Sequence, residues 1–306
     1  MKKEVRGLIV KREDGSEQVN YDDDNFPSYI NDGWIKPNVP WAKVPHFHED
    51  VELMTIKRGR LAYSVNGRQI ILEKGDSIFV NSNQIHYTVP LQEEAVTYVI
   101  FIARPNILNS SVAVEMQALQ PIVNNPKLPY LRFREINENT EQMRDIMLSL
   151  PDLRRDPFEV TRRFFDIWSI ILRQSKNYGM LEEDAQTDNY TRSFKSMMYY
   201  IQQNHQGAIS LDDIAASGNI SKSLCNKVFH KYVGDSPVNY LLNYRVRKAA
   251  ELLRTTALPL SEIAARTGFN GASYMSEMFK KSFEITPRGY RKLWQANAQE
   301  AGSRSS

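Results

Sequence analysis

The chain has 306 residues, which is enough for two domains that each bury their own core. No stretch approaches the about 18 apolar residues of a membrane-spanning helix, and the amino terminus lacks the apolar core of a secretory signal, so we expect a cytoplasmic protein. The single cysteine, Cys225, excludes an intrachain disulfide and a cysteine zinc cluster, and it is expected to be a packing residue.

Charge is unevenly distributed along the chain, although the net charge is only +3. Residues 191–295 contain 15 Lys and Arg against 7 Asp and Glu, which gives this segment a net charge of +8. Since the whole chain carries +3, all other residues together carry −5. A basic carboxy-terminal third beside an acidic remainder is the electrostatic pattern of a nucleic-acid-binding domain attached to a domain with another task.

Five short runs of strand character lie between residues 51 and 102: VELMTI, LAYSV, QIIL, SIFV and AVTYVIFI. Asn66 and Gly67 separate two of them and predict a type I′ hairpin, because both central residues of that turn need positive φ. The pattern predicts a compact antiparallel unit, and closure into a small barrel would remove its edges.

A group of histidines and a carboxylate falls within this β unit. In the stretch HFHEDVE, three side chains (His46, His48 and Glu52) share parity, so on a continuous strand they point to one face, and His86 follows a later strand. Such a set can bind a divalent transition metal, contact an effector, or form an internal hydrogen-bond network. Nearby aromatic side chains can stack on a ring or belong to the core. The candidate effector contacts are His46, His48, Glu52, His86, Trp34 and Tyr63.

Two helices are predicted after the β unit. One runs from about residue 138 to 149 with Met143, Ile146 and Met147 on one stripe, and the other covers residues 157–175 with an apolar and aromatic stripe. Each stripe either covers the barrel or forms a dimer interface. The acidic stretch that follows, residues 179–190, is predicted to be a linker.

The last hundred residues contain two similar helical units. In the first, Ser210 is the predicted cap of LDDIAAS, Asp213 completes a capping box, and Gly218 is expected to end the helix in a left-handed conformation. A second helix, about residues 221–233, completes a helix-turn-helix. The pattern returns at PLSEIAARTGF, where Ser261 and Gly268 are matched to Ser210 and Gly218.

The repeat has a period of fifty residues, seen in the pairs Phe229 and Phe279, Pro237 and Pro287, and Tyr240 and Tyr290. A helix that starts at Pro237 joins the two units and spans about 25 Å. That length is close to the about 34 Å between successive major grooves, so one chain would be able to read a duplex from one side.

Residues 191–293 resemble the DNA-binding domain of the AraC family of bacterial transcription regulators, most closely in LSEIAARTGFNGASYMSEMFKKSFEITPRGYR. The resemblance implies base-facing side chains on both recognition helices, and the residue types suit bases or phosphates. The base-facing set is Lys222, Ser223, Asn226, Lys227, Ala272, Ser273, Ser276 and Glu277, and the phosphate-facing set is Lys280, Lys281 and Arg288. Two positions depart from the pattern of the family. Position 277, which is a glutamate here, is often basic in the family. Position 284 is also a glutamate, whereas the corresponding position of the first helix-turn-helix retains a glycine, Gly234.

The amino-terminal half resembles the cupin-like sensor domain of such regulators, on the residues His46, His48, Glu52 and His86. Metal-dependent cupin enzymes use the same set. The proline and glycine common before the last histidine of those enzymes are Asn81 and Asn83 here.

These observations predict an α+β chain of two domains: a cupin-like antiparallel β barrel with a helical hairpin, then an all-α domain with two helix-turn-helix units. The predicted segments are 1–105 (effector-binding barrel), 106–178 (helical cover or dimerisation segment), 179–190 (linker), 191–295 (DNA-binding domain) and 296–306 (disordered tail).

The predicted function is a ligand-responsive transcription regulator rather than an enzyme, and the resemblance implies an activator of carbohydrate-use or other catabolic genes. Its expected partners are an operator in double-stranded DNA, a small-molecule effector such as a sugar, RNA polymerase and a second copy of the chain. No membrane partner and no required cofactor are expected, with a divalent metal as an option for the histidine cluster, and the expected location is the cytoplasm, at the nucleoid when bound to DNA. The alternatives are a metal-dependent isomerase or oxygenase carrying a DNA-binding module, and an architectural DNA binder whose barrel only dimerises.

Overall fold

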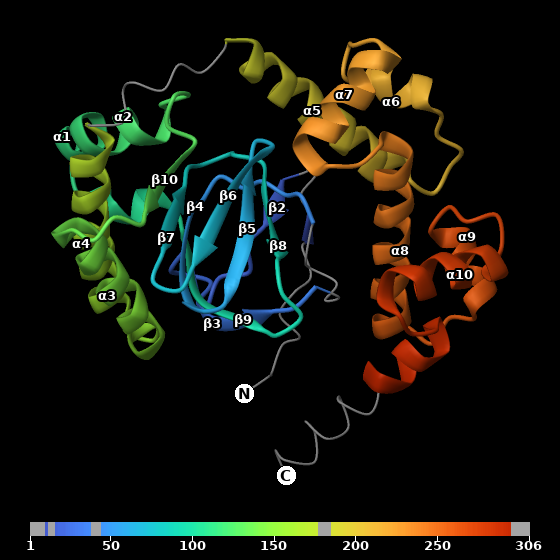
Figure 1. The fold of residues 1–306 in the computed structure, drawn as a ribbon, viewed down its shortest axis with the longest axis horizontal. Helices are drawn as coiled ribbons and strands as arrows, with labels where there is room; N and C mark the ends of the chain where they lie inside the picture. The colour runs from blue at the N-terminus through green and yellow to red at the C-terminus, as the bar shows by residue number, and fades with distance from the viewer. Residues whose placement is uncertain (1–9, 12–15, 38–43, 177–184, 295–306) are drawn as a thin grey trace. The chain divides into compact units, whose positions relative to one another are not determined.

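The structure is a computed structural model that describes residues 10–11, 16–37, 44–176 and 185–294 (Figure 1). It contains two compact units, one made of the described residues up to 191 and the other of residues 192–294. The predicted tail and residues 179–184 of the predicted linker lie outside the described residues. None of the helices in the described ranges is long and apolar enough to span a membrane.

The first unit is built on two antiparallel sheets. Five strands pair in the order β10-β7-β4-β9-β3 and three in the order β6-β5-β8, and β1 pairs with β2. The strand bounds are β1 (Val10–Lys11), β2 (Glu17–Gln18), β3 (Ser28–Ile35), β4 (Val51–Arg58), β5 (Arg60–Val65), β6 (Arg68–Glu73), β7 (Ser77–Val80), β8 (His86–Pro90), β9 (Val96–Ala103) and β10 (Tyr130–Phe133). The predicted turn at Asn66 and Gly67 is confirmed, since both have positive φ (48° and 82°) between β5 and β6.

The five-stranded sheet has two buried faces. Alternate residues of β4 point to opposite sides: Val51 and Leu53 belong to the large hydrophobic core, whereas Glu52 contacts Tyr63 of β5 and His86 of β8 in the three-stranded sheet. This alternation places the polar cluster between the sheets and the hydrophobic core on the outer face of the larger sheet.

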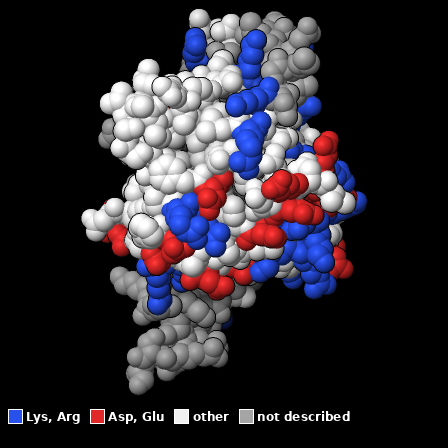
Figure 2. Space-filling model, turned by 90° about the vertical axis from the view of Figure 1, so that its left-hand side faces the viewer, with Lys and Arg blue, Asp and Glu red and all other residues white. Residues whose placement is uncertain are grey.

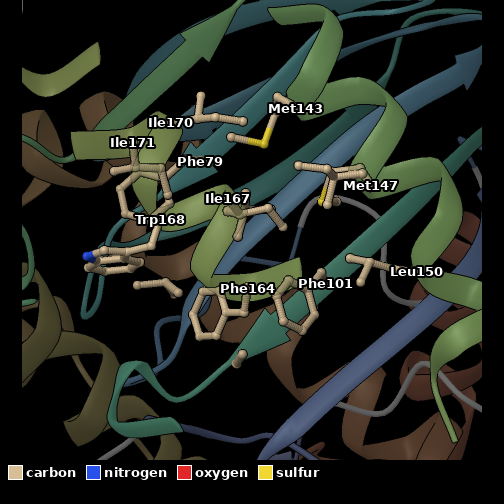
Figure 3. Close-up of a cluster of buried hydrophobic side chains, with 14 of the residues drawn as sticks. Phe79, Phe101, Met143, Met147, Leu150, Phe164, Ile167, Trp168, Ile170 and Ile171 are labelled. Carbon is tan, nitrogen blue, oxygen red and sulfur yellow. The ribbon is translucent and has the colours of Figure 1, made fainter. Parts of the chain in front are cut away.

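Two helices, α3 (Glu138–Leu153) and α4 (Pro157–Ser175), cover that outer face (Figure 1). Their apolar side chains meet those of the sheet in one cluster, where the Phe164 ring lies 5.1 Å from that of Phe101 and the Trp168 ring lies 6.2 Å from that of Phe79 (Figure 3). The predicted stripes therefore cover the barrel, and the alternative that these same stripes form a dimer interface is wrong. Leu172, near the end of α4, is only partly buried.

The sequence did not predict five strands of this unit: the two-residue strands β1 and β2, and also β3, β8 and β10. The β3 sequence SYINDGWI contains Asn, Asp and Gly, which usually signal a turn, yet it pairs with β9 over its whole length. The four-residue β10 lies inside the segment predicted to be helical and pairs with β7. His86 was expected after a strand and instead begins β8. Short helical pieces precede β10: η1 (Pro105–Leu108, a 3-10 helix), α1 (Val112–Val114), η2 (Glu115–Leu119, a π-helix) and α2 (Gln120–Val123).

The second unit is all helical within residues 192–294. Its helices are α5 (Ala185–Asn204), α6 (Leu211–Ser217), α7 (Lys222–Val233), α8 (Pro237–Thr255), α9 (Leu260–Arg266) and α10 (Ala272–Phe283). Because α5 begins at Ala185, residues 185–190 of the predicted linker are helical, and the division between the two units follows them, between residues 191 and 192.

The first helix-turn-helix consists of α6 and α7. Ser210 caps α6, and the capping box with Asp213 is confirmed by hydrogen bonds in both directions. The prediction for Gly218 is wrong, because its φ is −90° and the left-handed residue is the next one, Asn219, at φ 53°. The lack of a side chain at Gly218 still matters, since a Cβ there would lie 2.8 Å from the Met197 side chain, which would have to move.

The second helix-turn-helix, α9 and α10, is not an identical copy. Pro259 rather than Ser261 stands at the start of α9, and no side chain caps that helix. Gly268 is left-handed at φ 78° and corresponds to Asn219, so the match of Gly268 to Gly218 is wrong by one position. The turn before α10 is longer by one residue, Asn270, because α10 starts after Gly271 whereas α7 starts after Ser221.

The fifty-residue repeat is confirmed in the core. Phe229 and Phe279 are completely buried, Tyr240 and Tyr290 are buried against them at ring distances of 5.5 and 5.3 Å, and both units rest on α8. The 19 residues of α8 make a helix of about 28 Å, slightly longer than predicted.

Candidate functional site

The recognition helices expose the side chains that were predicted to face DNA. On α7, Lys222, Ser223 and Lys227 are exposed and Asn226 is partly exposed, while Cys225, Val228 and Phe229 face the core. On α10, Ser273 and Glu277 are exposed, Ala272 and Ser276 are partly exposed, and Met275 and Phe279 are buried. The spacing of three and four residues puts each exposed set on one side of its helix.

Several of these side chains have partners within the protein. Lys222 forms an ion pair with Asp212 of α6, with Nζ 2.7 Å from Oδ1. The Asn226 amide donates to the Lys222 carbonyl oxygen at 3.1 Å, and the Ser276 hydroxyl donates to the Ala272 carbonyl oxygen at 2.7 Å. DNA must therefore compete with local partners for three of the predicted contacts, whereas Lys227 is exposed at the middle of its helix.

Basic side chains continue beyond the predicted base-facing positions. Lys280 and Lys281 are exposed in the last turn of α10, and Arg288 is exposed just after it. Between them, Glu284 ends the helix with φ 60°, where the first unit has Gly234 at φ 67°. A non-glycine residue therefore occupies a left-handed conformation there, which glycine adopts with less strain.

The two helix-turn-helix units are joined by a contact that sequence reasoning missed. Arg245 of α8 donates from Nε to the His205 carbonyl oxygen at 2.8 Å and from Nη2 to the Gly207 carbonyl oxygen at 2.7 Å. The turn at Gly268 packs on the same carbonyl, and a Cβ on this glycine would be 2.1 Å from the His205 oxygen. This group of residues, called here the His205 clasp, ties the end of α5 to α8 and to the turn of the second unit.

The first unit brings the predicted histidines and carboxylate together. One ligand atom from each of His46, His48, Glu52 and His86 lies within 4.8 Å of all the others. Glu52 Oε2 is 3.4 Å from His48 Nε2 and 3.3 Å from His86 Nε2, and the Tyr63 hydroxyl donates to Glu52 Oε1. His48, Glu52, Tyr63 and His86 are buried, and His46 is partly buried.

The route by which they converge differs from the prediction. Residues 44–50 do not form a continuous strand with β4, because the chain bends at Glu49 and Asp50. His46 instead bridges to His86 by two backbone hydrogen bonds of 2.9 and 3.1 Å. Asp50 fixes the bend, since it accepts a hydrogen bond from Tyr21 at 2.7 Å and lies 3.3 Å from Arg104 Nε.

The electrostatics favour an ionised Glu52. Burial opposes the carboxylate, but the imidazoles of His86 and His48 hold the pKa of Glu52 well below its usual range. Burial, with the neighbouring His86, holds the pKa of His46 well below its ordinary value. His48 is also penalised by burial, but the Glu52 carboxylate raises its pKa. Burial and the Glu52 charge raise the pKa of Tyr63 well above its ordinary value, so its hydroxyl stays a donor.

The two departures from the cupin pattern do not prevent this convergence. Asn83 takes the left-handed conformation (φ 63°) for which glycine is common, and its backbone N–H donates to the His48 carbonyl oxygen at 2.7 Å. Asn81 is buried, and its amide donates to the carbonyl oxygens of Ile122 and Leu128. The loop therefore delivers His86 without the proline and glycine.

Trp34 is not brought to the cluster. It lies on β3 opposite Thr97 and shares parity with Ile30, a residue of the outer core, so its side chain is on the other face of the sheet from Glu52. It is also 50% exposed. Of the two predicted aromatic contacts, Tyr63 therefore belongs to the cluster and Trp34 does not.

The outer helices of the first unit carry mixed charges. In Figure 2, acidic and basic side chains are intermixed across the middle of the face that includes α3 and α4. On α4, Arg162 pairs with Glu159 at 2.7 Å and approaches Asp166 at 3.4 Å. A mixed surface of this kind differs from the basic recognition helices and does not favour DNA.

Comparison with known proteins agrees with both halves of this description. A family model described as a helix-turn-helix domain matches residues 214–293, and one described as a cupin domain matches residues 36–102. The chain is 24% identical to the uncharacterised HTH-type transcriptional regulator YdeC of Bacillus subtilis over 253 residues, which cover 81% of this chain and 86% of that protein. It is also 24% identical to the HTH-type transcriptional activator RhaS of Klebsiella pneumoniae, over 88% of this chain and 95% of RhaS.

In both halves the chain resembles transcription regulators of the AraC family. The helix-turn-helix match and the relatives indicate a DNA-binding transcription regulator rather than a metal-dependent enzyme. Among solved structures, ToxT of Vibrio cholerae matches 88% of this chain and 96% of its own, with 12% identity and a TM-score of 0.42. The DNA-binding domain of AdpA in complex with a target DNA matches 35% of this chain and 95% of its own, with 22% identity and a TM-score of 0.33.

Three residues belong to the two candidate sites in addition to the predicted set. Asp212 pairs with Lys222, and a negative residue ten positions before a recognition-helix lysine gives no sequence signal of that pairing. Glu17 Oε2 lies 3.4 Å from His46 Nε2, and only the fold brings it there from β2. Tyr274 is 49% exposed on α10 between the predicted contacts Ser273 and Ser276. Its position in the helical pattern of the sequence would have been enough to identify it as a candidate DNA contact.

Proposed function

We propose that this regulator is an activator that binds two successive major grooves of its operator with α7 and α10 of one chain. The observation that supports this most is the His205 clasp, because it fixes the turn of the second helix-turn-helix against α8 and the end of α5. Recognition helices held at one separation require operator half-sites at one spacing, about 10 to 10.5 base pairs.

We further propose that a small polar molecule, with sugars as the first class to test, acts as the effector through the barrel that holds His48, Glu52, Tyr63 and His86. The buried polar side chains between two sheets support this, since a ligand that changes their hydrogen bonds would change the packing of both sheets. An effector alters DNA binding only if its affinity differs between two arrangements of the protein. In this proposal the regulator acts in the cytoplasm on nucleoid DNA and recruits RNA polymerase to catabolic genes.

The experiment is an effector screen followed by an operator assay. Thermal unfolding of the full chain is measured with a panel of sugars and sugar acids, because a ligand at 100 times its Kd stabilises the native state by about 2.7 kcal/mol. Hits are then tested for their effect on operator affinity and on transcription with purified polymerase. Tyr63→Phe keeps the ring but removes the hydroxyl that binds Glu52, so it is expected to weaken the effector response while leaving basal DNA binding unchanged.

The proposal of an effector in the barrel fails if every active ligand stabilises Tyr63→Phe and the unaltered chain equally. The proposal of an operator-binding activator fails if the chain has no preferred DNA sequence, or if bound protein does not raise transcription. These two results are independent of each other.

A homodimer is proposed as the working assembly. Phe158 and Phe165 of α4 are 75% and 40% exposed and lie seven residues apart, on one side of the helix and away from the buried stripe. A second copy of the chain would cover them. Sedimentation of the full chain and of Phe158→Asp tests this: the proposal expects a dimer that dissociates more readily in the variant, and a monomer in both would contradict it.

A further inference from the structure

Arg247 of α8 is a cation without an anionic partner in the DNA-binding unit. Its guanidinium carbon lies 5.9 Å from the centre of the Tyr240 ring and 5.8 Å from that of Tyr244. Among the described residues, its guanidinium has no ion pair and no hydrogen-bond acceptor, although the side chain is partly buried. Aromatic rings attract a cation, but they do not replace the oxygen acceptors that its five N–H groups need.

Two more donors beside Arg247 are unpaired. The Tyr240 hydroxyl and Nε2 of Gln202 are buried, and neither has a hydrogen-bond partner within the part of the chain that the structure describes. Burial raises the pKa of Tyr240 to about 12, while Arg247 and the Gln202 amide act in the opposite direction, so both groups lie near this hydroxyl. The hydroxyl therefore keeps its proton, and all three groups present donors.

Two helices hold these donors together. On α8, Tyr240, Tyr244 and Arg247 follow one another at spacings of four and three residues, which places them on one side of the helix. On α5, Gln202 and His205 are three residues apart, and the His205 ring lies 5.1 Å from that of Tyr244. The donors therefore lie where one side of α5 packs against one side of α8.

The charges around this place are mainly positive. Burial lowers the pKa of His205, and the charges of Lys248 and Arg245 lower it further. The acidic residue nearby is Glu251, but its carboxylate is already paired with Lys248 Nζ at 2.8 Å. Glu251 therefore does not serve as the counter-charge of Arg247.

An anion accounts for these groups better than a water molecule. A water could accept hydrogen bonds from two of the donors, but it would leave the charge of Arg247 uncompensated. Rotation of the Gln202 amide would give the Tyr240 hydroxyl an acceptor, and the same charge would remain. An oxyanion would accept from all three groups and neutralise the guanidinium, whose fork matches two oxygen atoms of a carboxylate or phosphate.

We propose that Arg247, Tyr240 and Gln202 bind one small free oxyanion through its carboxylate or phosphate group. This goes beyond the proposed function, whose effector occupies the other unit of the chain. The His205 clasp joins the same two helices, since Arg245 of α8 binds the carbonyl oxygens of His205 and Gly207 at the end of α5. A bound anion would therefore stabilise the junction that holds both helix-turn-helix units.

The test is a titration of the full chain, with isotope-labelled arginine, by inorganic phosphate and separately by acetate at constant ionic strength. The Nε–H resonance of Arg247, assigned by its loss in Arg247→Met, should shift and saturate. The rise of the urea midpoint with phosphate gives the affinity in each variant. Arg247→Met should lower this affinity by about 10- to 100-fold, and Tyr240→Phe, which keeps the ring, by about 3- to 10-fold.

Arg254→Met is the matched control, because Arg254 is also partly buried and lies 5.0 Å from the centre of an aromatic ring, that of Trp294. Its phosphate affinity should equal that of the unaltered chain. If Arg247→Met does not fold, Tyr240→Phe provides the same comparison. The proposal is overturned by a shift that does not saturate, by similar shifts of all arginines, or by equal affinity in the unaltered chain and the variants of Arg247 and Tyr240.

Operator DNA separates a free anion from the phosphates of a duplex. In phosphate-free buffer, bound operator should leave the Arg247 resonance able to respond to added phosphate. Displacement of phosphate by the operator would assign these donors to the DNA backbone and overturn the claim of a free anion. Operator affinity measured in the same buffer tests the regulator itself, so its failure is distinguished from failure of the anion site.

Discussion

Gly268 turns the chain directly against the carbonyl oxygen of His205, in a left-handed conformation with φ 78° and with room for no Cβ: one built there would be 2.1 Å from that oxygen. Because the neighbouring atom is backbone, the contact cannot relax by a change of side-chain rotamer. The orientation of the second helix-turn-helix therefore depends on the absence of a side chain at this position.

Gly268→Ala is expected to destabilise the second helix-turn-helix by more than about 2 kcal/mol. The alanine would be strained at positive φ, and its Cβ would also clash with the backbone oxygen of His205. Gly234→Ala is the matched control, with φ 67° and no atom within 4 Å of the added Cβ, and it should cost only about 1 kcal/mol. Urea unfolding of both full-length variants, followed by circular dichroism, gives the comparison. Equal losses would show that the His205 contact does not constrain the turn.

The pair between Asp212 and Lys222 is expected to restrain DNA binding. Asp212→Asn frees Lys222 and removes a negative charge beside α7, and an exposed pair of this kind is worth up to about 1 kcal/mol, so operator affinity should rise by up to about fivefold. Lys222→Ala should weaken binding less than Lys227→Ala, because Lys222 must first leave its ion pair with Asp212 to contact DNA. Fluorescence anisotropy at several salt concentrations measures both, and the salt slope should fall by about 1 in Lys227→Ala. Unchanged affinity in Asp212→Asn would argue against this role for the pair.

Neighbouring phenylalanines of α4 should differ sharply in their contribution to stability. Phe164 is completely buried between Phe101 and Trp168, so Phe164→Ala should cost about 3 to 5 kcal/mol through lost burial and the cavity left behind. Phe165→Ala, one position along and 40% exposed, should cost less than about 1 kcal/mol. Denaturant unfolding of the two variants tests the assignment of the buried stripe, which would be reversed if Phe165→Ala were the more damaging change.

The stability of the DNA-binding unit should fall in mild acid because of His205. Burial lowers the pKa of this imidazole, and the charges of Lys248 and Arg245 act in the same direction, against the Gln202 carbonyl. The unfolded state, with a pKa of about 6.5, then binds the proton first, so stability is lost as the pH falls from about 7 through 6.5 toward the folded-state pKa.

The measurement is the urea midpoint of the full chain at pH 7.5 and 5.5. His205→Gln should show a smaller decrease between these two values than the unaltered chain, because the other four histidines contribute equally to both proteins. An identical pH dependence would mean that His205 does not take up a proton on unfolding.

The sequence predicted local structure correctly at positions where few residue types can adopt the required backbone conformation or make the required hydrogen bond. Asn66-Gly67 predicted its turn because few residues tolerate positive φ, and the capping box at Ser210 and Asp213 formed as expected. The stripe on α4 also predicted burial, but the sheet that it covers became evident only in the fold, since a stripe does not specify its partner.

The errors arose where tertiary pairing overrides local signals. β3 is a strand despite its central Asn-Asp-Gly because β9 supplies hydrogen bonds along its whole length. Gly218 was correctly singled out for the wrong reason: its missing side chain leaves room for Met197, and Asn219 takes the left-handed conformation. Glu17 and Asp212 could not be foreseen, because each approaches its partner through the arrangement of separate elements.

The most direct test of this account is a footprint of the full chain on its operator, with the operator obtained by selection from random DNA. Hydroxyl-radical protection should show, for each bound chain, two segments on one side of the duplex with centres about 10 base pairs apart. Lys227→Ala should weaken one segment and Ser273→Ala the other, because the two residues lie on different recognition helices. A single protected segment per chain, or two that both variants weaken equally, would contradict the claim that one chain reads two successive major grooves.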